Sequence, residues 1–354
     1  MDDAKKVNRR KFLTTGLAGA GILGAGAAIG WVATRSQKSA FTGKDSRAPL
    51  GDRFTYDVSA YTKIDPALII YAEQTKIPTG LQTSSCLTVG RGDVIYVGGD
   101  REVKLLDKTG AALSSITLAG KPNAVAQGED GRLYVAFKNQ FEVFDATGKS
   151  VLKSEPLDVR AHLTALAQHE DKIFAADAGN REVLICGLDG KVQSRFGKVG
   201  KAAEGTGFTV PSPYFDLLFG AEDLLWVVNP GRHLIQAYLP DGKYQTGWGA
   251  TGLTIEAFCG CCNPVHLARL PDGGFVTSEK GLNRVKVFTG NGKFVGVVAG
   301  PEQLGRDMDQ VQKALDDANA GITYDIACDS TGRVLVLDPV SRVIRVFARK
   351  EKTT

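Results

Sequence analysis

Hydrophobic and polar residues alternate in short, paired runs along most of the chain. In each pair, a hydrophobic run is followed by a polar turn, a second alternating run and a glycine-containing turn such as Asp189-Gly190 or Asn291-Gly292. Alternation with a period of two is typical of half-buried strands, and the turns are typical of hairpins. Six such pairs are visible, namely Asp93–Val97 with Glu102–Leu106, Gly131–Val135 with Phe141–Asp145, Lys172–Ala176 with Glu182–Ile185, Leu224–Val228 with Leu234–Tyr238, Gly274–Thr277 with Arg284–Phe288, and Arg333–Leu337 with Val343–Phe347.

The spacing of these pairs predicts the architecture. They follow one another at roughly 40 to 60 residues, a range typical of propeller repeats. Each pair then forms the middle of a four-stranded blade, and six blades close around a channel. The pattern therefore predicts an all-β fold, a six-bladed β-propeller over residues 64–350 with an N-terminal signal or anchor helix before it.

Two segments depart from the repeat. The alternating run Ala67–Tyr71 is predicted to be a strand that completes the last blade, because strands from both ends of the chain would remove the open edge of the ring. Residues 301–320 have a helical composition and are predicted to form a helical insertion between the fifth and sixth blades.

Loop motifs around the strands carry a family resemblance. A glycine-rich linker and a proline precede an inner strand, as in Gly247-Trp248-Gly249 through to Pro264, and polar loops precede third strands, as in Asp177–Arg181 and Lys280–Arg284. Over about residues 80–350 the chain resembles NHL repeats. The resemblance implies a propeller fold and says little of function, since such propellers include binding modules and lyases alike.

The first 38 residues are interpreted as a targeting segment. Lys5 and Lys6 precede the pair Arg9-Arg10, and an apolar run over residues 14–33 follows. This order resembles a twin-arginine (Tat) export signal, which implies export of a folded protein. A plain transmembrane anchor is the alternative. No small-residue cleavage site follows the run, which is long enough to span a bilayer, so residues 1–38 are predicted to be a signal or membrane anchor, followed by a linker over residues 39–63.

The charge distribution supports this division of the chain. Of the 43 Lys and Arg residues, seven lie within residues 1–38 beside two Asp, so the remainder is close to neutral. Clustered basic surface is needed to bind phosphates, so the near-neutral charge of the repeat region argues against nucleic acid as a partner. Positive charge before the apolar run predicts that residues 40 onward lie outside the cytoplasm, in the periplasm or an equivalent extracytoplasmic space. An uncleaved N-terminal segment would tether them to the membrane.

Three of the six cysteines fall within four residues. Cys259, Cys261 and Cys262 lie in the loop that leads into the fifth blade, shortly before His266. Thiolates with an imidazole suit copper(I), zinc or an iron–sulfur cluster. The alternatives are disulfide bonds, which form more often outside the cytoplasm, or a nucleophilic cysteine. Adjacent cysteines can join only in a strained ring, so pairing with Cys259 or a neighbouring blade is the expected disulfide.

A second group of candidate residues is predicted at the channel. Alignment of the copies on their turn glycines puts Asp216, His266 and Asp325 at equivalent inner positions of the fourth, fifth and sixth blades. Ser85, Ala124 and Thr164 take that level in the other three blades. One histidine with two carboxylates can bind a divalent cation or perform acid–base chemistry. The alternative is a hydrated polar channel.

Three functions follow as hypotheses. The first is an exported binding or redox scaffold in which Cys259, Cys261 and Cys262, with His266, Asp216 and Asp325, hold a metal or redox centre. The second is an extracellular lyase or hydrolase that uses a channel metal, because the architecture resembles that of amidating and streptogramin lyases. The third is an interaction module of the cell envelope, with a protein partner or a small ligand on its top face and no chemistry.

Overall fold

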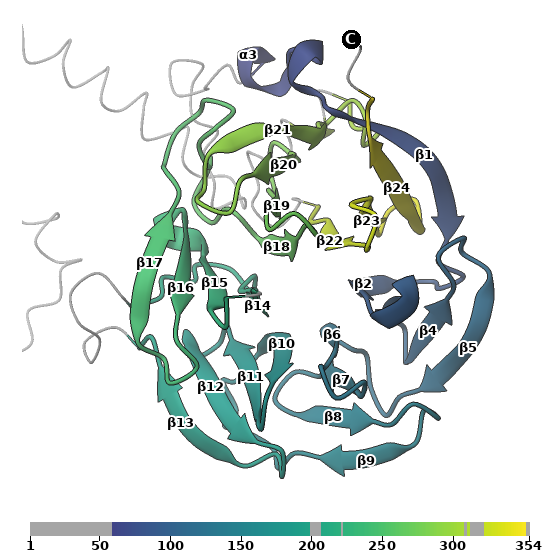
Figure 1. Cartoon of the computed structure of the whole chain (residues 1–354), viewed down its shortest axis with the longest axis vertical. Helices are drawn as coiled ribbons and strands as arrows, with labels where there is room; N and C mark the ends of the chain where they lie inside the picture. The colour runs from purple at the N-terminus through teal and green to yellow at the C-terminus, as the bar shows by residue number, and fades with distance from the viewer. Residues whose placement is uncertain (1–58, 199–206, 221, 308–309, 312–321, 352–354) are drawn as a thin grey trace, which may run out of the picture. The chain divides into compact units, whose positions relative to one another are not determined.

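Six four-stranded antiparallel sheets stand around a central axis in the computed structural model (Figure 1). The structure describes residues 59–198, 207–220, 222–307, 310–311 and 322–351. The expected signal or anchor segment lies outside these residues, as does most of the linker. Within the described ranges, no helix is both long enough and apolar enough to cross a membrane. The all-β, six-bladed propeller predicted from the repeat is confirmed.

Each of the first three blades runs outward from the channel in chain order. They comprise β2 (Ser84–Val89), β3 (Ile95–Gly99), β4 (Glu102–Leu106) and β5 (Ala112–Thr117); β6 (Ala124–Gln127), β7 (Leu133–Ala136), β8 (Phe141–Phe144) and β9 (Ser150–Lys153); and β10 (Leu163–His169), β11 (Lys172–Asp177), β12 (Glu182–Gly187) and β13 (Val192–Phe196).

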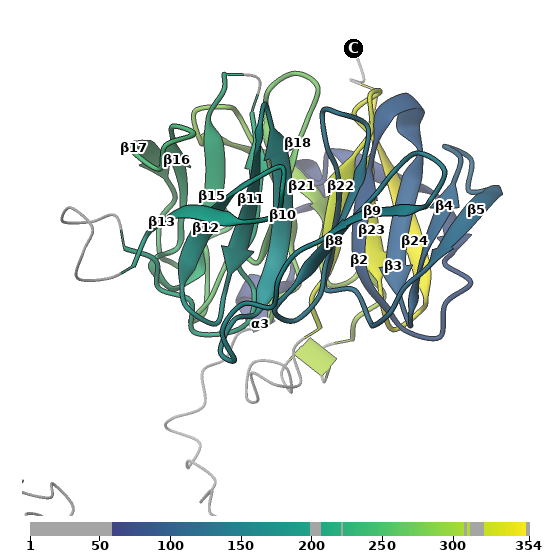
Figure 2. The same cartoon turned by 90° about the horizontal axis from the view of Figure 1, so that it is seen from below.

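The last three blades repeat this order, except that the sixth takes its outer strand from the start of the propeller. They comprise β14 (Leu217–Phe219), β15 (Leu225–Asn229), β16 (Leu234–Tyr238) and β17 (Tyr244–Trp248); β18 (His266–Arg269), β19 (Phe275–Ser278), β20 (Val285–Phe288) and β21 (Phe294–Ala299); and β22 (Asp325–Cys328), β23 (Val334–Asp338), β24 (Val343–Arg349) and β1 (Tyr71–Pro78). The six predicted pairs are the second and third strands of the six blades. Seen from the side, the strands of a blade run next to one another (Figure 2).

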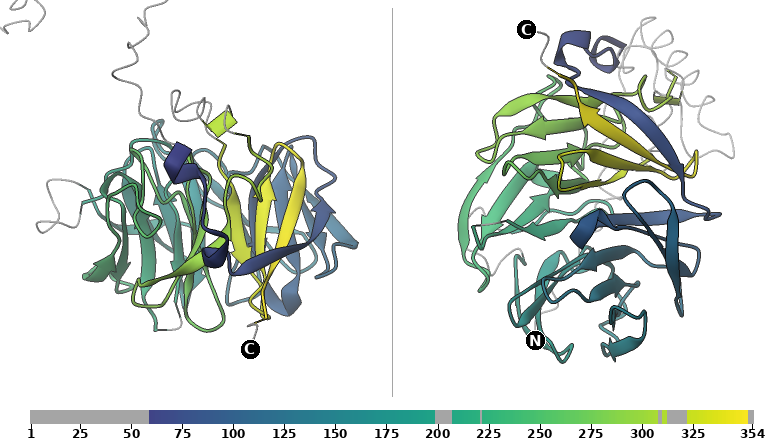
Figure 3. Two further views of the ribbon diagram at one scale, coloured as in Figure 1. Left: turned by 90° about the horizontal axis from the view of Figure 1, so that it is seen from above. Right: turned by 45° about the vertical axis from the view of Figure 1, so that its right-hand side comes forward.

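The ring is closed by β1, which pairs antiparallel with β24 from Tyr71 opposite Arg349 to Pro78 opposite Val343 (Figure 3). Closure by the N-terminal side was predicted correctly, but the predicted strand Ala67–Tyr71 was wrong. Residues Pro66–Leu68 form the 3-10 turn η2, after the short helix α3 (Ser59–Thr62), and Ile69 bridges to Val297 of β21. The true strand escaped prediction because it lies on the outside and four of its central residues are exposed.

The hydrophobic core lies between neighbouring blades. Alternate residues of a middle strand face opposite neighbours: Leu225 and Val227 of β15 pack with the third blade, whereas Trp226 and Val228 pack with the fifth. Both faces of such a strand are therefore buried. This explains why second strands such as β15 are continuous hydrophobic runs. The outer strands β5 and β17 bury little and are polar, whereas the outer strand β21 has four buried residues and is apolar.

A ring of hydrogen bonds joins the six blades near the start of their inner strands. Each bond runs from one blade to the next and has a main-chain group on one side. The bonds are Ser85 Oγ to Pro122 O (2.6 Å), Asn123 Nδ2 to Leu163 O (3.2 Å), Thr164 Oγ1 to Phe215 O (2.6 Å), Leu267 N to Asp216 Oδ2 (2.9 Å), Ser278 Oγ to Tyr324 O (2.7 Å) and Leu87 N to Asp325 Oδ2 (2.7 Å). We call this set the inter-blade ring.

Only part of the expected helical insertion over residues 301–320 falls within the described residues. Residues 301–305 form turns, with Leu304 N bonded to Gly300 O and Gly305 N to Glu302 O, and residues 310 and 311 are helical. Arg306 fastens the segment to the sixth blade through Asp338, at 3.3 Å. Residues 308–309 and 312–320 lie outside the described ranges.

Candidate functional site

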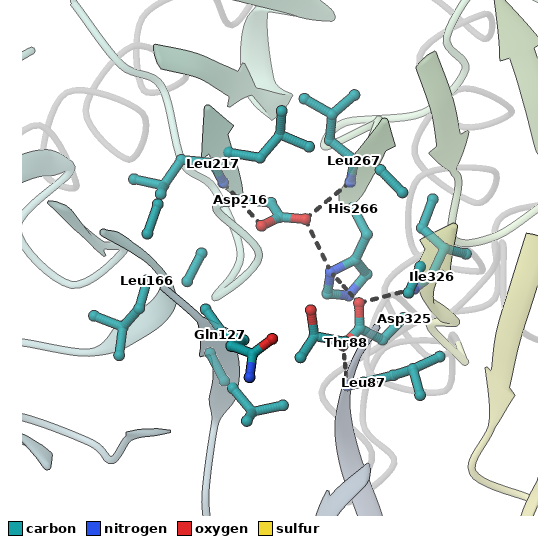
Figure 4. Close-up of a pocket in the computed structure, with 18 of the residues that line it drawn as sticks. Leu87, Thr88, Gln127, Leu166, Asp216, Leu217, His266, Leu267, Asp325 and Ile326 are labelled. Carbon is teal, nitrogen blue, oxygen red and sulfur yellow. Dashed lines mark hydrogen bonds and ion pairs between the residues drawn. The ribbon is translucent and has the colours of Figure 1, made fainter. Parts of the chain in front are cut away.

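The structure brings the three predicted channel residues together (Figure 4). His266 Nδ1 lies 3.5 Å from Asp216 Oδ2 and 3.4 Å from Asp325 Oδ1. Asp216 precedes β14, and His266 and Asp325 begin β18 and β22, so the three side chains meet because three consecutive blades place the same position at the axis. The sequence alignment of the blades predicted this proximity.

The two carboxylates have structural partners of their own. Asp216 accepts hydrogen bonds from the main-chain N–H groups of Leu217 and Leu267. Asp325 does the same for Ile326 and Leu87. Two of these four bonds belong to the inter-blade ring. The carboxylates therefore serve first to join blades, and His266 lies between them as a counter-charge.

Burial shapes the protonation of this group. Burial raises the pKa of Asp325 to about 6, and the nearby Asp216 carboxylate adds to the effect, although His266 opposes it. Burial lowers the pKa of His266, but the charges of Asp325 and Asp216 outweigh it, so this pKa is raised. Since the folded pKa of Asp325 exceeds its ordinary value of 3.8, its contribution to stability is fully present below about pH 4 and is lost as the pH rises through 6.

The level of His266 divides the channel into two chambers. We call the chamber on the side where the chain enters the inner strands the upper chamber. Its volume is about 280 Å³, and it is lined by residues that precede the inner strands, including Lys121, His162 and Tyr214. The lower chamber, of about 370 Å³, is lined by the inner strands themselves, including Thr88 and Gln127. Asn123, Thr164 and His266 line both. In the second blade the polar residue at this level is thus Asn123, one position before the predicted Ala124.

The cysteine loop is fixed to the fifth blade through its main chain. Asn263 donates from Nδ2 to the carbonyl oxygens of Cys259 and Lys280, at 2.5 and 3.0 Å, and accepts from Lys280 N at 2.9 Å. Gly260 adopts a positive φ of 88°, which favours glycine, and its carbonyl oxygen lies 2.7 Å from His233 Nε2. These contacts hold the turn that carries Cys261 and Cys262.

Beneath the loop lies a buried charge cluster, formed by Glu279, Arg284 and Lys286. Glu279 contacts Arg284 at 2.8 Å and Lys286 at 2.6 Å, and all three side chains are at most 1% exposed. Lys286 Nζ also donates to the carbonyls of Ile255 and Ala257 and lies 4.4 Å from the centroid of the Phe258 ring. Burial lowers the pKa of Lys286 to about 8, although Glu279 opposes the shift. The cluster connects the approach to the cysteine loop with β20.

The three thiols of the loop have different surroundings. Cys261 is exposed and Cys262 is buried, and their sulfur atoms lie 3.3 Å apart. Cys259 is partly buried, and burial raises its pKa. All six cysteines are free thiols. The sulfur–sulfur contact in this loop is therefore between the adjacent pair, and the disulfide expected with Cys259 or with a neighbouring blade is not formed.

Cys262 has two polar neighbours that its position in the sequence did not reveal. Lys280 from the turn after β19 and Ser212 from the loop before β14 lie beside its sulfur. Burial acts to raise the pKa of Cys262, but Lys280, Ser212 and the Cys261 thiol outweigh it, so the pKa is lowered. For Cys261, burial and then contact with Cys262 raise the pKa.

The metal hypothesis finds limited support in this geometry. Among the residues that the structure describes, no three or more His, Cys, Asp or Glu side chains are grouped so as to hold a metal ion. Tetrahedral zinc with bonds of about 2.3 Å to sulfur keeps two thiolates roughly 3.8 Å apart, farther than the Cys261–Cys262 pair. The carboxylates of Asp216 and Asp325 already accept hydrogen bonds from main-chain N–H groups. Cys259, Cys261 and Cys262 therefore remain only predicted ligands, as do His266, Asp216 and Asp325.

Comparisons with known proteins support the fold. No protein-family model and no curated protein sequence matches this chain. Among solved structures, a streptogramin B lyase covers 81% of this chain and 100% of its own with a TM-score of 0.54 and 11% identity. The WD40 β-propeller domain of Doa1 covers 76% of this chain and 80% of its own, with a TM-score of 0.52 and 14% identity. At these identities the similarity shows a shared propeller fold and nothing of activity.

The protonation of the channel can be tested by NMR titration of the four histidines. We expect a pKa of His266 above the ordinary value of about 6.5, and a lower pKa in the variant Asp325→Asn, because one of the two charges that raise it is removed. His162 is the internal control, since burial lowers its pKa and Asp325 does not contribute. An unchanged His266 in the variant would contradict this account.

The buried charge cluster predicts a large effect of Glu279→Gln. The substitution leaves two buried cations without their anion, so the free energy of unfolding should fall by about 3–5 kcal/mol, measured by urea denaturation. The matched control is Glu182→Gln, whose partner Arg195 is 46% exposed and where a loss of about 1 kcal/mol is expected. Adding Lys286→Met to Glu279→Gln should recover part of the loss. Equal losses at the two glutamates would contradict the importance of the cluster.

Proposed function

We propose that this protein is an exported, NHL-like propeller that acts as a thiol redox scaffold, with Cys261 and Cys262 as its redox centre. The observation that carries the proposal is the 3.3 Å separation of their sulfur atoms, with one thiol exposed and the other beside Lys280. A lowered pKa increases the fraction of thiolate, which is the form that reacts. A short closing movement of the two side chains would form a disulfide between them.

The reaction is thiol–disulfide exchange with a disulfide of a second molecule. One thiolate of the pair attacks that disulfide and releases one thiol, and the second cysteine then attacks the mixed disulfide and releases the other. The pair loses two electrons and two protons, and the second molecule gains them. Strained disulfides are readily reduced, and adjacent cysteines close a strained ring, so the pair suits reversible rather than structural oxidation.

The surroundings of the pair favour a scaffold over a channel enzyme. Ser212, next to Cys262, is followed in the chain by Pro213 and Tyr214, which line the upper chamber. A small ligand in that chamber, or an envelope protein on the same face, would therefore lie close to the pair. Lyase chemistry at a channel metal has less support, because both channel carboxylates already accept hydrogen bonds from main-chain N–H groups.

Oxidation of the purified, folded protein tests the redox centre. After reduction, treatment with oxidised glutathione should remove two titratable thiols and the mass of two hydrogen atoms, and peptide mapping should place the disulfide at Cys261–Cys262. The variants Cys261→Ser and Cys262→Ser should lose this product. Cys186→Ala is the matched control, since Cys186 is fully buried in β12 and burial raises its pKa to about 12.

Two outcomes would contradict the proposal. One is a protein whose six thiols all survive the treatment, or whose disulfide joins Cys259 to another cysteine. The other is copper, zinc or iron bound in stoichiometric amount after aerobic and anaerobic purification, and lost from Cys261→Ser and Cys262→Ser. That result would favour a metal centre in the same loop.

Export is a separate part of the proposal and has its own test. Arg9 and Arg10, before the apolar run, support a twin-arginine signal that is retained as a tether to the membrane. In a bacterium with this pathway, the full chain should fractionate with membranes and be open to external protease. The variant Arg9→Lys/Arg10→Lys should accumulate inside the cell. Undiminished export of this variant would contradict a twin-arginine route.

A further inference from the structure

Cys261 and Cys262 differ in which sides of their sulfur atoms a second molecule can reach. Cys261 lies on the surface, whereas Cys262 is 1% exposed. Lys280 and Ser212 lie beside the Cys262 sulfur, and Lys280 is itself only 9% exposed. A molecule that arrives from solvent therefore meets Cys261 first.

This asymmetry matters because exchange at a disulfide is directional. The attacking thiolate approaches one sulfur from the side opposite to the S–S bond, and the other sulfur leaves with the bonding electrons. Because Cys261 is exposed, a thiolate from solvent can reach its sulfur. Cys262 is 1% exposed, so the protein covers its sulfur.

The charged groups around the pair also distinguish the two sulfur atoms, because the neighbouring cation lies beside Cys262. Lys280 carries its ammonium group beside Cys262, and the same group lies 5.2 Å from the centroid of the Tyr214 ring. Its main-chain N–H and C=O both bond to the Asn263 side chain, so the residue is fixed at the base of the loop. A negative charge that appears on the Cys262 sulfur therefore forms next to a fixed cation.

On the basis of the redox function proposed above, we infer that the site oxidises thiols, with Cys261 as the sulfur that forms the mixed disulfide and Cys262 as the sulfur that is released. The substrate class is a compound with two thiols, either a small molecule or a protein. Lys280 is a positioning residue, which stabilises the released Cys262 sulfur without touching the substrate.

The steps balance without a further reactant. A substrate thiolate bonds to Cys261 Sγ while the Cys261–Cys262 bond breaks, and the electron pair goes to Cys262 Sγ. The second substrate thiolate then bonds to the first substrate sulfur, and Cys261 leaves. The substrate ends as a disulfide, and the cysteine pair gains two electrons and takes up the two protons that the substrate thiols lose. A disulfide compound restores the oxidised pair as described above.

A trapping experiment on the full chain tests these roles. The protein is oxidised with oxidised glutathione, and then receives reduced glutathione together with iodoacetamide, which alkylates whichever cysteine is released. Fragment-ion mapping should find glutathione on Cys261 and the alkyl group on Cys262, in excess of the reverse arrangement by about tenfold or more. A parallel sample receives reduced, unfolded ribonuclease in place of reduced glutathione. The probe that forms its adduct faster shows whether the substrate is a small molecule or a protein.

Variants at Lys280 test its positioning role. Lys280→Met should slow adduct formation at Cys261 and shift the equilibrium with glutathione toward the oxidised pair, each by about tenfold, because the released sulfur loses its cation. Lys280→Arg should restore both, which a merely structural role does not predict. Lys280→Met behaving like the parent protein would overturn this role.

The trapping results also separate this inference from the function on which it rests. If oxidation yields no Cys261–Cys262 disulfide, the redox function itself fails. If the disulfide forms but glutathione is found on Cys262, or equally on both cysteines, the assignment of roles fails and the redox function stands. If neither thiol probe gives an adduct with the oxidised pair, the substrate class is wrong.

Discussion

The inter-blade ring is the constraint on which the rest of this propeller depends. Each blade has its apolar surface on two faces, so it cannot bury its core alone and is stable only between two neighbours. The ring adds hydrogen bonds of known direction at the inner edge of each of these contacts, typically worth about 0.5–1.5 kcal/mol apiece. It therefore fixes the rotation of one blade against the next, while the apolar clusters supply most of the stability. Asp216 and Asp325 belong to this ring, which accounts for buried carboxylates at the axis.

The cysteine pair depends on the same registration of blades. Cys262 belongs to the loop of the fifth blade, whereas Ser212 belongs to the loop of the fourth. Leu267 N bonds to Asp216 Oδ2 across the same two blades, so the contact that aligns the inner strands also sets the two loops against each other. The environment of the Cys262 sulfur thus depends on the closed ring and not only on the local CGCC sequence.

The repeat made the fold predictable because the middle strands are buried on both faces and their composition is uniform. The channel residues were predictable for the same reason: equal positions in equal blades meet at one axis. Other features had no such periodicity. The strand β1 buries little more than Tyr71 and Ile77, and its polar sequence gives no strand signal. The proximity of Lys280 and Ser212 to Cys262 arises from a turn and a loop whose paths are set by contacts such as those of Asn263, and sequence spacing does not encode these paths.

The atoms that hold the cysteine loop in place are not the sulfur atoms to which we assign the proposed redox role. The contacts that hold the cysteine loop are made by main-chain groups and by the side chains of Asn263, Glu279 and His233, and none requires a sulfur atom. The inter-blade ring also uses no cysteine side chain. The sulfur atoms of Cys261 and Cys262 take no part in these contacts. Oxidation, reduction or substitution of the two cysteines should therefore leave the hydrogen bonds that hold the loop intact. A disulfide that stabilises a fold joins separate elements and closes a loop between them, whereas a disulfide between two adjacent residues closes almost no loop, so the Cys261–Cys262 pair is not suited to a stabilising role.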